Sequence, residues 1–143
     1  MNNPFWAGSL LALFALTHAQ AAAPSSAPAD LQTARVALAA AVAAHDLKAI
    51  TKLADFPLPI DAYRTAPKLT EAKFLADKTE FTNVFGDGDP SVVECLRKAD
   101  ASLQNDPKEF GAGSWVVDCN GLEYYFGQRQ GHWRLVGYQN INE

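Results

Sequence analysis

Histidine is the side chain best suited to proton transfer near neutral pH, and two of the three histidines, His45 and His132, lie beyond position 21. His45 falls at the expected end of a helix, where a cation interacts favourably with the helix dipole, so we expect a capping role rather than a catalytic one. His132 lies beside an expected hairpin turn, and we expect it to be exposed. No serine stands in a G-x-S-x-G motif, so nothing supports hydrolysis by a nucleophile–histidine–acid triad.

The sequence Asp87-Gly88-Asp89 places two carboxylates at a spacing that can share a calcium ion. An EF-hand loop would need a further ligand two residues on, then a glycine and a glutamate at its twelfth position. Pro90 follows Asp89 instead. We therefore expect a turn followed by a helix cap, and we expect neither a metal nor a cofactor.

The chain has two cysteines, Cys95 and Cys119. In an oxidising compartment an isolated pair most simply forms one disulfide bond. Closing a loop of about 25 residues would stabilise the fold by about 3 kcal/mol in the chain-entropy model. The alternative, a redox pair or a metal site, lacks both a C-x-x-C spacing and a nearby histidine.

The N-terminus has the pattern of a secretory signal peptide. Apolar and small residues fill positions 5–16, and Ala19-Gln20-Ala21 forms a small-x-small cleavage site, so we expect a signal peptide over residues 1–21. The apolar run is shorter than the roughly 20 residues that span a bilayer. Residues 22–29 are expected to form a disordered leader and residues 30–143 a single domain, located in the periplasm or secreted.

The charges exclude two classes of partner. All 16 acidic and all 12 basic residues follow position 21, so the expected mature chain keeps the net charge of -4. Nucleic acid would require a concentrated basic face, and an anionic membrane would require a basic amphipathic helix. The basic residues are scattered instead, so we expect neither nucleic acid nor membrane as a partner.

Helix signals dominate the first hundred residues. Apolar spacing predicts a first helix through His45 that Asp30 can cap, and Asp46, Thr70 and Asp89 are expected to cap the helices that follow. Residues 56–63 contain two prolines and are expected to be extended at an edge or crossing. A weak strand is expected around residues 101–103. The apolar face of the third helix is expected to comprise Phe74, Leu75, Phe81, Val84 and Phe85.

The C-terminal part reads as an antiparallel meander. Apolar runs at 115–119, 122–128 and 133–139 are separated by Asn120-Gly121 and by Arg129-Gln130-Gly131, which are turn sequences. Helices followed by strands predict an α+β fold, with N-terminal helices packed on a curved antiparallel sheet that ends in a three-stranded C-terminal meander.

Both faces of this meander carry apolar bulk. Strict alternation places one group of side chains on one side of their strands: Trp115, Val117, Cys119, Tyr124, Phe126, Trp133 and Leu135. It places another group on the opposite side: Val116, Tyr125, Val136 and Tyr138. The second face is therefore expected to be covered too, by the chain itself, a partner or a ligand.

Paired N-terminal helices, a helix over 74–85 and a meander over 111–142 stand in an order that resembles the nuclear transport factor 2-like superfamily, in which a curved sheet wraps round helices as a cystatin-like cone. The chain is also similar to small exported bacterial proteins of unknown function with a Phe-Pro-Leu turn and a last strand ending in Ile-Asn, here Phe56-Pro57-Leu58 and Ile141-Asn142. The resemblance implies the cone fold and a pocket inside it.

The superfamily contains isomerases, dehydratases and binding modules, so the resemblance does not decide function. Its enzymes use a buried Asp or His, often opposite a tyrosine; the matching types here are Asp61, Asp77 and Asp118, with Tyr63 and Tyr125. A carboxylate in a water-poor cone would have a raised pKa and could act as a base. The simpler interpretation is that Asp61 and Asp77 are solvated and that Asp118 lies on the outer side of its strand, so no catalytic residue is assigned.

Tyrosine and tryptophan beside arginine are the residue types that dominate protein interfaces. We therefore expect an exported, non-catalytic binding protein, acting through the aromatic sheet face on a protein partner or a second copy, in the manner of an inhibitor or an immunity protein. The alternatives are a small cone-fold enzyme, an isomerase or hydrolase with a buried acid, and a small-ligand carrier. The expected binding residues are Tyr63, Tyr125, Arg134 and Tyr138.

Overall fold

Helices come first along the chain, and an antiparallel sheet follows. The computed structural model describes residues 26–60, 68–104, 110 and 113–142. Its helical elements are α1 (Ala29–Ala43), α2 (Leu47–Leu53), α3 (Glu71–Ala76), α4 (Lys78–Phe85), the 3-10 turn η1 (Gly86–Gly88) and α5 (Pro90–Lys98). Its strands are β1 (Ser102–Leu103), β2 (Trp115–Cys119), β3 (Leu122–Arg129) and β4 (His132–Asn140). The strands lie in the order β1-β2-β3-β4, and each neighbouring pair is antiparallel.

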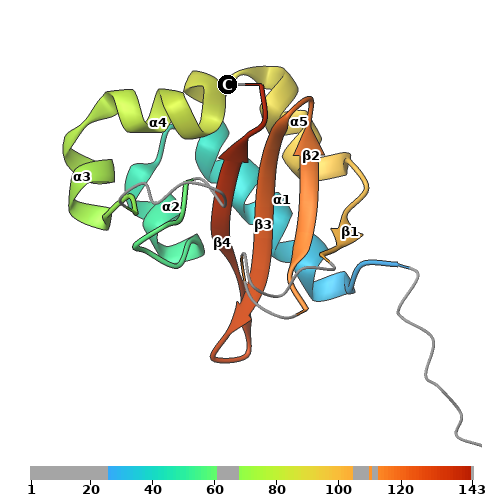
Figure 1. Cartoon of the computed structure of the whole chain (residues 1–143). Coiled ribbons are helices and arrows are strands. Elements are labelled where there is room, and N and C mark those ends of the chain that lie inside the picture. The colour runs from blue at the N-terminus through green and yellow to red at the C-terminus, as the bar shows by residue number, and fades with distance from the viewer. Residues whose placement is uncertain (1–25, 61–67, 105–109, 111–112, 143) are drawn as a thin grey trace, which may run out of the picture.

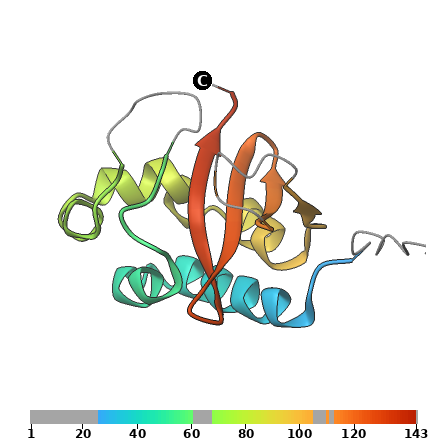
Figure 2. The ribbon, with the colours of Figure 1, turned by 60° about the horizontal axis from the view of Figure 1, so that its bottom comes forward.

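The helices lie against one face of this sheet. α1 and α2 contact β4, and α5 contacts β2. Figures 1 and 2 show α1 and α5 on the same side of the strands. We call the side of the sheet that faces these helices the inner face and the opposite side the outer face. The expected α+β fold, with N-terminal helices packed on an antiparallel sheet, is confirmed.

Three helices begin where the sequence places a capping side chain. Asp46 accepts a hydrogen bond from the amide of Ala49 at 2.9 Å, and Thr70 accepts one from the amide of Lys73 at 3.2 Å. Asp89 accepts one from the amide of Ser91 at 2.7 Å, ahead of Pro90 in the first turn of α5. Each cap satisfies an amide that has no partner within its own helix, which explains why these boundaries were predictable.

Two expected helix boundaries were wrong. α1 begins at Ala29 after Pro28, without a side-chain cap, because the Asp30 carboxylate bonds only to the next amide, that of Leu31. The expected third helix is interrupted at Asp77, whose carboxylate accepts from the amide of Thr79 at 2.9 Å and so starts α4 as a separate helix. The interruption turns Leu75 outward, and its side chain is 39% exposed rather than part of the apolar face.

The meander turns where the sequence predicts. Asn120-Gly121 and Gln130-Gly131 each form a two-residue hairpin loop, and all four residues have positive φ, between 52° and 88°. Two consecutive positive φ values define the type I′ turn, whose twist matches that of the flanking strands. The β2–β3 register pairs Trp115 with Phe126 and Val117 with Tyr124, so these side chains share the inner face.

One irregularity in β4 changes which residues face the helices. Tyr125 pairs with Gly137 but Phe126 pairs with Leu135, so Val136 is an extra residue in β4. Such a β-bulge shifts the alternation of the residues beyond it. The placement of Tyr138 on the outer face was therefore wrong: Tyr138 pairs with Tyr124 on the inner face, is 5% exposed and donates its hydroxyl to the carbonyl of Asn83 at 2.9 Å.

The space between the sheet and the helices is packed with aromatic rings. Phe85 stacks on Tyr124 with ring centroids 5.8 Å apart and planes 3° apart, and Phe74 and Phe81 contact Phe85. The Tyr124 hydroxyl donates to the Val84 carbonyl at 2.7 Å, near the end of α4. These rings pack against one another on the helix-facing side of the sheet.

The segment after α2 covers the free edge of β4. The amide of Asp55 donates to the carbonyl of Leu135 at 2.8 Å, and the amide of Tyr138 donates to the carbonyl of Pro59 at 2.9 Å. These bonds occupy backbone groups that an edge strand otherwise leaves open to another chain. The expected extended segment over 56–63 is thus seen at a sheet edge up to residue 60, and its remainder lies outside the described residues.

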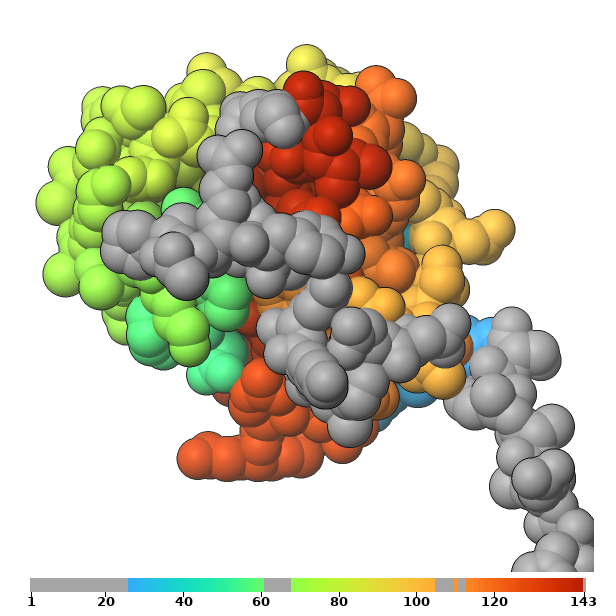
Figure 3. All heavy atoms as spheres, viewed as in Figure 1, coloured from blue at the N-terminus to red at the C-terminus, as the bar shows by residue number. Residues whose placement is uncertain are grey.

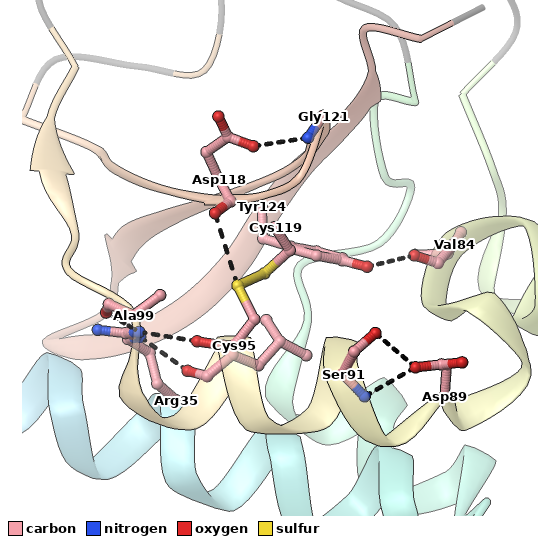
Figure 4. The surroundings of a disulfide bond; sticks show 11 residues. Arg35, Val84, Asp89, Ser91, Cys95, Ala99, Asp118, Cys119, Gly121 and Tyr124 are labelled. Atoms are coloured by element: carbon pink, nitrogen blue, oxygen red, sulfur yellow. Dashed lines mark hydrogen bonds between the residues drawn. A yellow bond between two sulfur atoms is a disulfide. The ribbon is translucent and has the colours of Figure 1, made fainter.

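Cys95 and Cys119 form the expected disulfide, which fastens α5 to the end of β2 (Figure 4). The Cα atoms of the two cysteines are 5.7 Å apart. A disulfide of this kind is consistent with an oxidising compartment outside the cytoplasm. The single structural crosslink predicted from the cysteine count is confirmed.

A buried arginine joins α1 to the end of α5 beside the disulfide (Figure 4). Arg35 is 2% exposed and donates to the carbonyls of Cys95, Leu96 and Ala99. The Cys95 carbonyl also accepts the amide of Ala99 at 2.9 Å, whereas the carbonyls at the end of a helix otherwise lack partners within it. A cation at this end interacts favourably with the helix dipole. Burial lowers the pKa of Arg35, and the negative charge of Asp100 opposes that shift.

Candidate binding surface

The acids considered for catalysis are not placed beside a tyrosine in the core. Asp77 lies at the start of α4, where its carboxylate caps the helix. Asp118 is exposed on the outer side of β2, and its carboxylate accepts from the amide of Gly121 at 2.8 Å, which supports the β2–β3 turn. Asp61 and Tyr63 lie outside the described residues. Asp118 thus lies on the outer side of its strand, as the simpler interpretation expected.

The outer face carries its own apolar group, which we call the outer cluster: Phe110, Val116, Tyr125 and Val136. Phe110 stacks on Tyr125 with ring centroids 3.9 Å apart and planes 22° apart. The same ring lies directly over Gly137, where a Cβ atom would meet it. The expectation that this face would be covered is thus met in part by the chain itself, through Phe110.

Tyr125 lies on the outer face, as the alternation predicted, but it is only 4% exposed. Its hydroxyl donates to the carboxylate of Glu123 at 2.7 Å. Val116 is the half-buried member of the outer cluster, and it is therefore the member open to contact from outside. Of the expected binding residues, Tyr125 and Arg134 point to the outer side, Tyr138 lies in the core, and Tyr63 is outside the described residues.

Charged side chains continue the outer face toward the β3–β4 turn. Arg129 donates its Nε to the carboxylate of Asp55 at 2.7 Å, which ties the hairpin to the segment after α2. A Cβ atom at Gly127 would lie 3.1 Å from Nη1 of Arg129 and 3.2 Å from a methyl group of Val136, so the glycine gives the guanidinium room beside the cluster. A groove of about 340 Å³ lies here, lined by Thr51, Lys52, Ala54, Asp55, Arg129, Gln130 and Arg134.

Figure 3 shows the β3–β4 turn projecting from the body of the molecule, below the helices. The groove lies beside this turn, because Gln130 of the turn lines it. We call it the hairpin groove.

The two histidines occupy different hollows. His45 follows α1 with a left-handed backbone (φ 53°), and its ring lies 4.8 Å from that of Phe81, in a hollow of about 380 Å³ that also contains Lys78 and Asp87. His45 closes the helix through its backbone, since its amide donates to the Val42 carbonyl at 3.0 Å.

His132 is exposed, as expected, and lines a second hollow of about 380 Å³ between α1 and the hairpin. Trp133 lines the same hollow, and its buried indole nitrogen has no hydrogen-bond partner among the residues that the structure describes. Asp87 lies in η1 with φ 58°, within the expected turn. Among the described residues, no group of three or more potential metal-ligating side chains occurs.

Sequence reasoning identified Arg134 but missed the residues that surround it. Lys52 and Asp55 belong to a different part of the chain, and only the pairing of Asp55 with β4 brings them to the hairpin. The two glycines inside strands, Gly127 and Gly137, were the available signal, because glycine in a strand interior often marks a close approach by another group.

The fold and its surfaces define a small α+β protein with helices on one face of a four-stranded antiparallel sheet. No family model, curated protein or solved structure matches the chain. No helix in the described part of the chain is long and apolar enough to cross a membrane.

Proposed function

We propose that this chain is an exported binding protein that acts by contact through the outer face of its sheet. The proposal rests on a difference in exposure between the two faces of the sheet. Aromatic rings are buried on the inner face, whereas Val116 and Arg134 are partly exposed on the outer face. Arginine is among the residue types enriched at interface hot spots, and Val116 is the apolar side chain of the outer cluster that a partner can reach. The partner is a protein, either an exported one or a second copy, as in an inhibitor or immunity protein.

Export is part of the proposal. The expected signal peptide and the Cys95–Cys119 disulfide both favour a periplasmic or secreted location. We also propose that the fold is related to the nuclear transport factor 2-like superfamily, because its helices and meander follow one another in the same order. The enzyme and carrier alternatives each need space inside the fold, and the contacts among Phe74, Phe81, Phe85 and Tyr124 on the helix-facing side of the sheet favour the binding protein over them.

Site-specific photocrosslinking tests the proposal. A photoreactive phenylalanine derivative replaces Val116 in the full-length chain, expressed in its natural host, and the matched control carries the same group at Val36, which is 41% exposed on α1. We expect one discrete crosslinked species from position 116 and none from position 36. Light scattering across a hundredfold range of concentration then distinguishes a second copy from a different protein.

A strictly monomeric chain whose crosslinking at position 116 matches that at position 36 would refute the proposal. If the crosslink from position 116 is unchanged when Arg134 is replaced by alanine, the partner contacts the outer cluster and not the arginine.

A further inference from the structure

The hairpin groove gathers positive charge on an acidic protein. Lys52, Arg129 and Arg134 line it against a single carboxylate, that of Asp55, which leaves two positive charges in excess. The whole chain carries a net charge of -4. A local excess of the opposite sign raises the concentration of anions near the groove and steers them toward it.

The donors of this groove are only partly used. Arg129 gives its Nε to Asp55 and its Nη1 to the carbonyl of Gln128 at 3.0 Å, which leaves Nη2 for a further acceptor. Lys52 and Arg134 form no ion pair with another described residue. A planar guanidinium that is held in place by one carboxylate can bind a second with little further loss of side-chain entropy.

The groove is positioned by the fold rather than by loose side chains. The Asp55 amide donates to the Leu135 carbonyl at 2.8 Å, so the backbone beside Lys52 is fixed to the strand that carries Arg134. Gly127 gives Arg129 room to lie over the sheet. The backbones that carry Lys52 and Arg134 are therefore fixed in relation to each other, and Arg129 is held by Asp55, which distinguishes the hairpin groove from scattered surface charge.

We propose that the hairpin groove binds an acidic segment of a protein partner through its carboxylates. This inference rests on the proposed function and names the chemistry of the partner. Arg129 and Asp55 are each more than 40% exposed, and a single exposed ion pair contributes little, so one free anion would bind weakly. Several carboxylates on one chain engage the three basic groups together and gain from their linkage. A flat anionic membrane would instead bring the acidic remainder of this protein against negative charge.

The test follows the Nε–Hε signals of Arg129 and Arg134 by NMR in the ¹⁵N-labelled, disulfide-bonded protein. The probes are hexaglutamate, inorganic phosphate and vesicles containing phosphatidylglycerol. We expect hexaglutamate to shift both signals with an apparent Kd at least tenfold lower than that of phosphate. We also expect that Kd to rise severalfold between 50 and 300 mM NaCl, because salt screens exposed charges.

Charge reversal provides the matched control. Arg134→Glu should weaken hexaglutamate binding at least tenfold, whereas Arg97→Glu, the same change on α5 beside Glu94, should alter it less than twofold. Circular dichroism establishes that both variants fold. Equal weakening by the two variants, equal affinity for phosphate, or preferential binding to vesicles would each overturn the inference.

The two proposals fail separately, because hexaglutamate binding requires no natural partner. Absence of that binding with the Val116 crosslink intact would remove only the acidic partner. Absence of the crosslink with hexaglutamate binding intact would remove contact through the outer cluster.

Discussion

The inner and outer faces of the sheet use aromatic residues in different ways. On the inner face, Tyr124 and Phe126 are 0% and 1% exposed beneath several helices. On the outer face, the ring of Phe110 is the cover that the described residues supply to the rest of the outer cluster, and the charged hairpin groove lies further toward the β3–β4 turn. Substitutions on the inner face should therefore lower the free energy of unfolding more than matched substitutions on the outer face, because the inner face is the more enclosed of the two.

Truncating one aromatic side chain on each face tests this difference most directly. Phe126→Ala should lower the free energy of unfolding by about 3–5 kcal/mol, because it removes a fully enclosed ring and leaves a cavity. Phe110→Ala should cost only about 1–2 kcal/mol, since its neighbours can collapse into the space. Urea denaturation followed by tryptophan fluorescence measures both values.

Val36→Ala, on the exposed side of α1, is the control and should change stability by less than about 0.5 kcal/mol. Equal costs for Phe110→Ala and Phe126→Ala would show that the outer cluster is as constrained as the core.

The disulfide fastens only the inner layer, because it joins α5 to β2. Replacing both Cys95 and Cys119 by alanine should lower the free energy of unfolding by about 3 kcal/mol, since the 24-residue separation no longer restricts the unfolded chain. The variant should still bind hexaglutamate at the hairpin groove, which lies on other elements. Thermal unfolding, with the NMR titration repeated on the variant, measures both effects. Loss of binding in a variant that is folded would show that the two regions are coupled.

The parts of the fold that were predictable are those fixed by local chemistry. The caps at Asp46, Thr70 and Asp89 and the turn at Asn120-Gly121 follow from single residues whose side chain or backbone suits one position. The paired cysteines were equally informative, because an isolated pair has one simple outcome.

The errors have non-local causes. Strict alternation could not reveal the bulge at Val136, so Tyr138 was placed on the wrong face. The expected third helix was drawn through Asp77, but the carboxylate of Asp77 starts a new helix. Arg35 was not recognised as a buried group because its partners are carbonyls about sixty residues away in α5.

The candidate surface was predictable only in outline. Arg134 and Tyr125 follow from residue type and strand parity, but the hairpin groove depends on contact between Asp55 and residues far along the chain. No local pattern encodes that contact.

A methyl group at Gly137 tests whether Phe110 seals the outer face. Gly137→Ala should cost about 1–3 kcal/mol, because the new Cβ meets the ring of Phe110 and displaces it. In the Phe110→Ala background the same change should cost nothing, since the obstructing ring is gone and alanine restricts the unfolded chain more than glycine does. The double-mutant cycle measures this coupling by chemical denaturation. If the stability costs of the two substitutions simply add in the double variant, the ring of Phe110 does not lie against Gly137 in solution.

The smallest predicted effect concerns one hydroxyl on the inner face. Tyr124→Phe should cost about 1 kcal/mol at pH 7, because the Val84 carbonyl near the end of α4 loses its donor. Burial, with a smaller contribution from Tyr138, raises the pKa of Tyr124 above its ordinary value. The folded state therefore keeps this hydroxyl protonated after the unfolded chain, with a tyrosine pKa of about 10, has begun to ionise.

The contribution of Tyr124 to the free energy of unfolding should thus be fully present below about pH 10. It should fall as the pH rises further, by up to about 1.4 kcal/mol per pH unit. The phenylalanine variant lacks this term, so the stability difference between the two proteins should shrink above pH 10 and then reverse. Tyr125→Phe is the outer-face comparison, since its hydroxyl bonds to the Glu123 carboxylate. Urea denaturation at pH 7, 10 and 11 measures both variants. The contrary result would be a difference in free energy of unfolding between the wild type and Tyr124→Phe that stays constant through pH 11. In that case the tyrosinate would be tolerated on the inner face, which would then be less enclosed than the stacking of Tyr124 on Phe85 indicates.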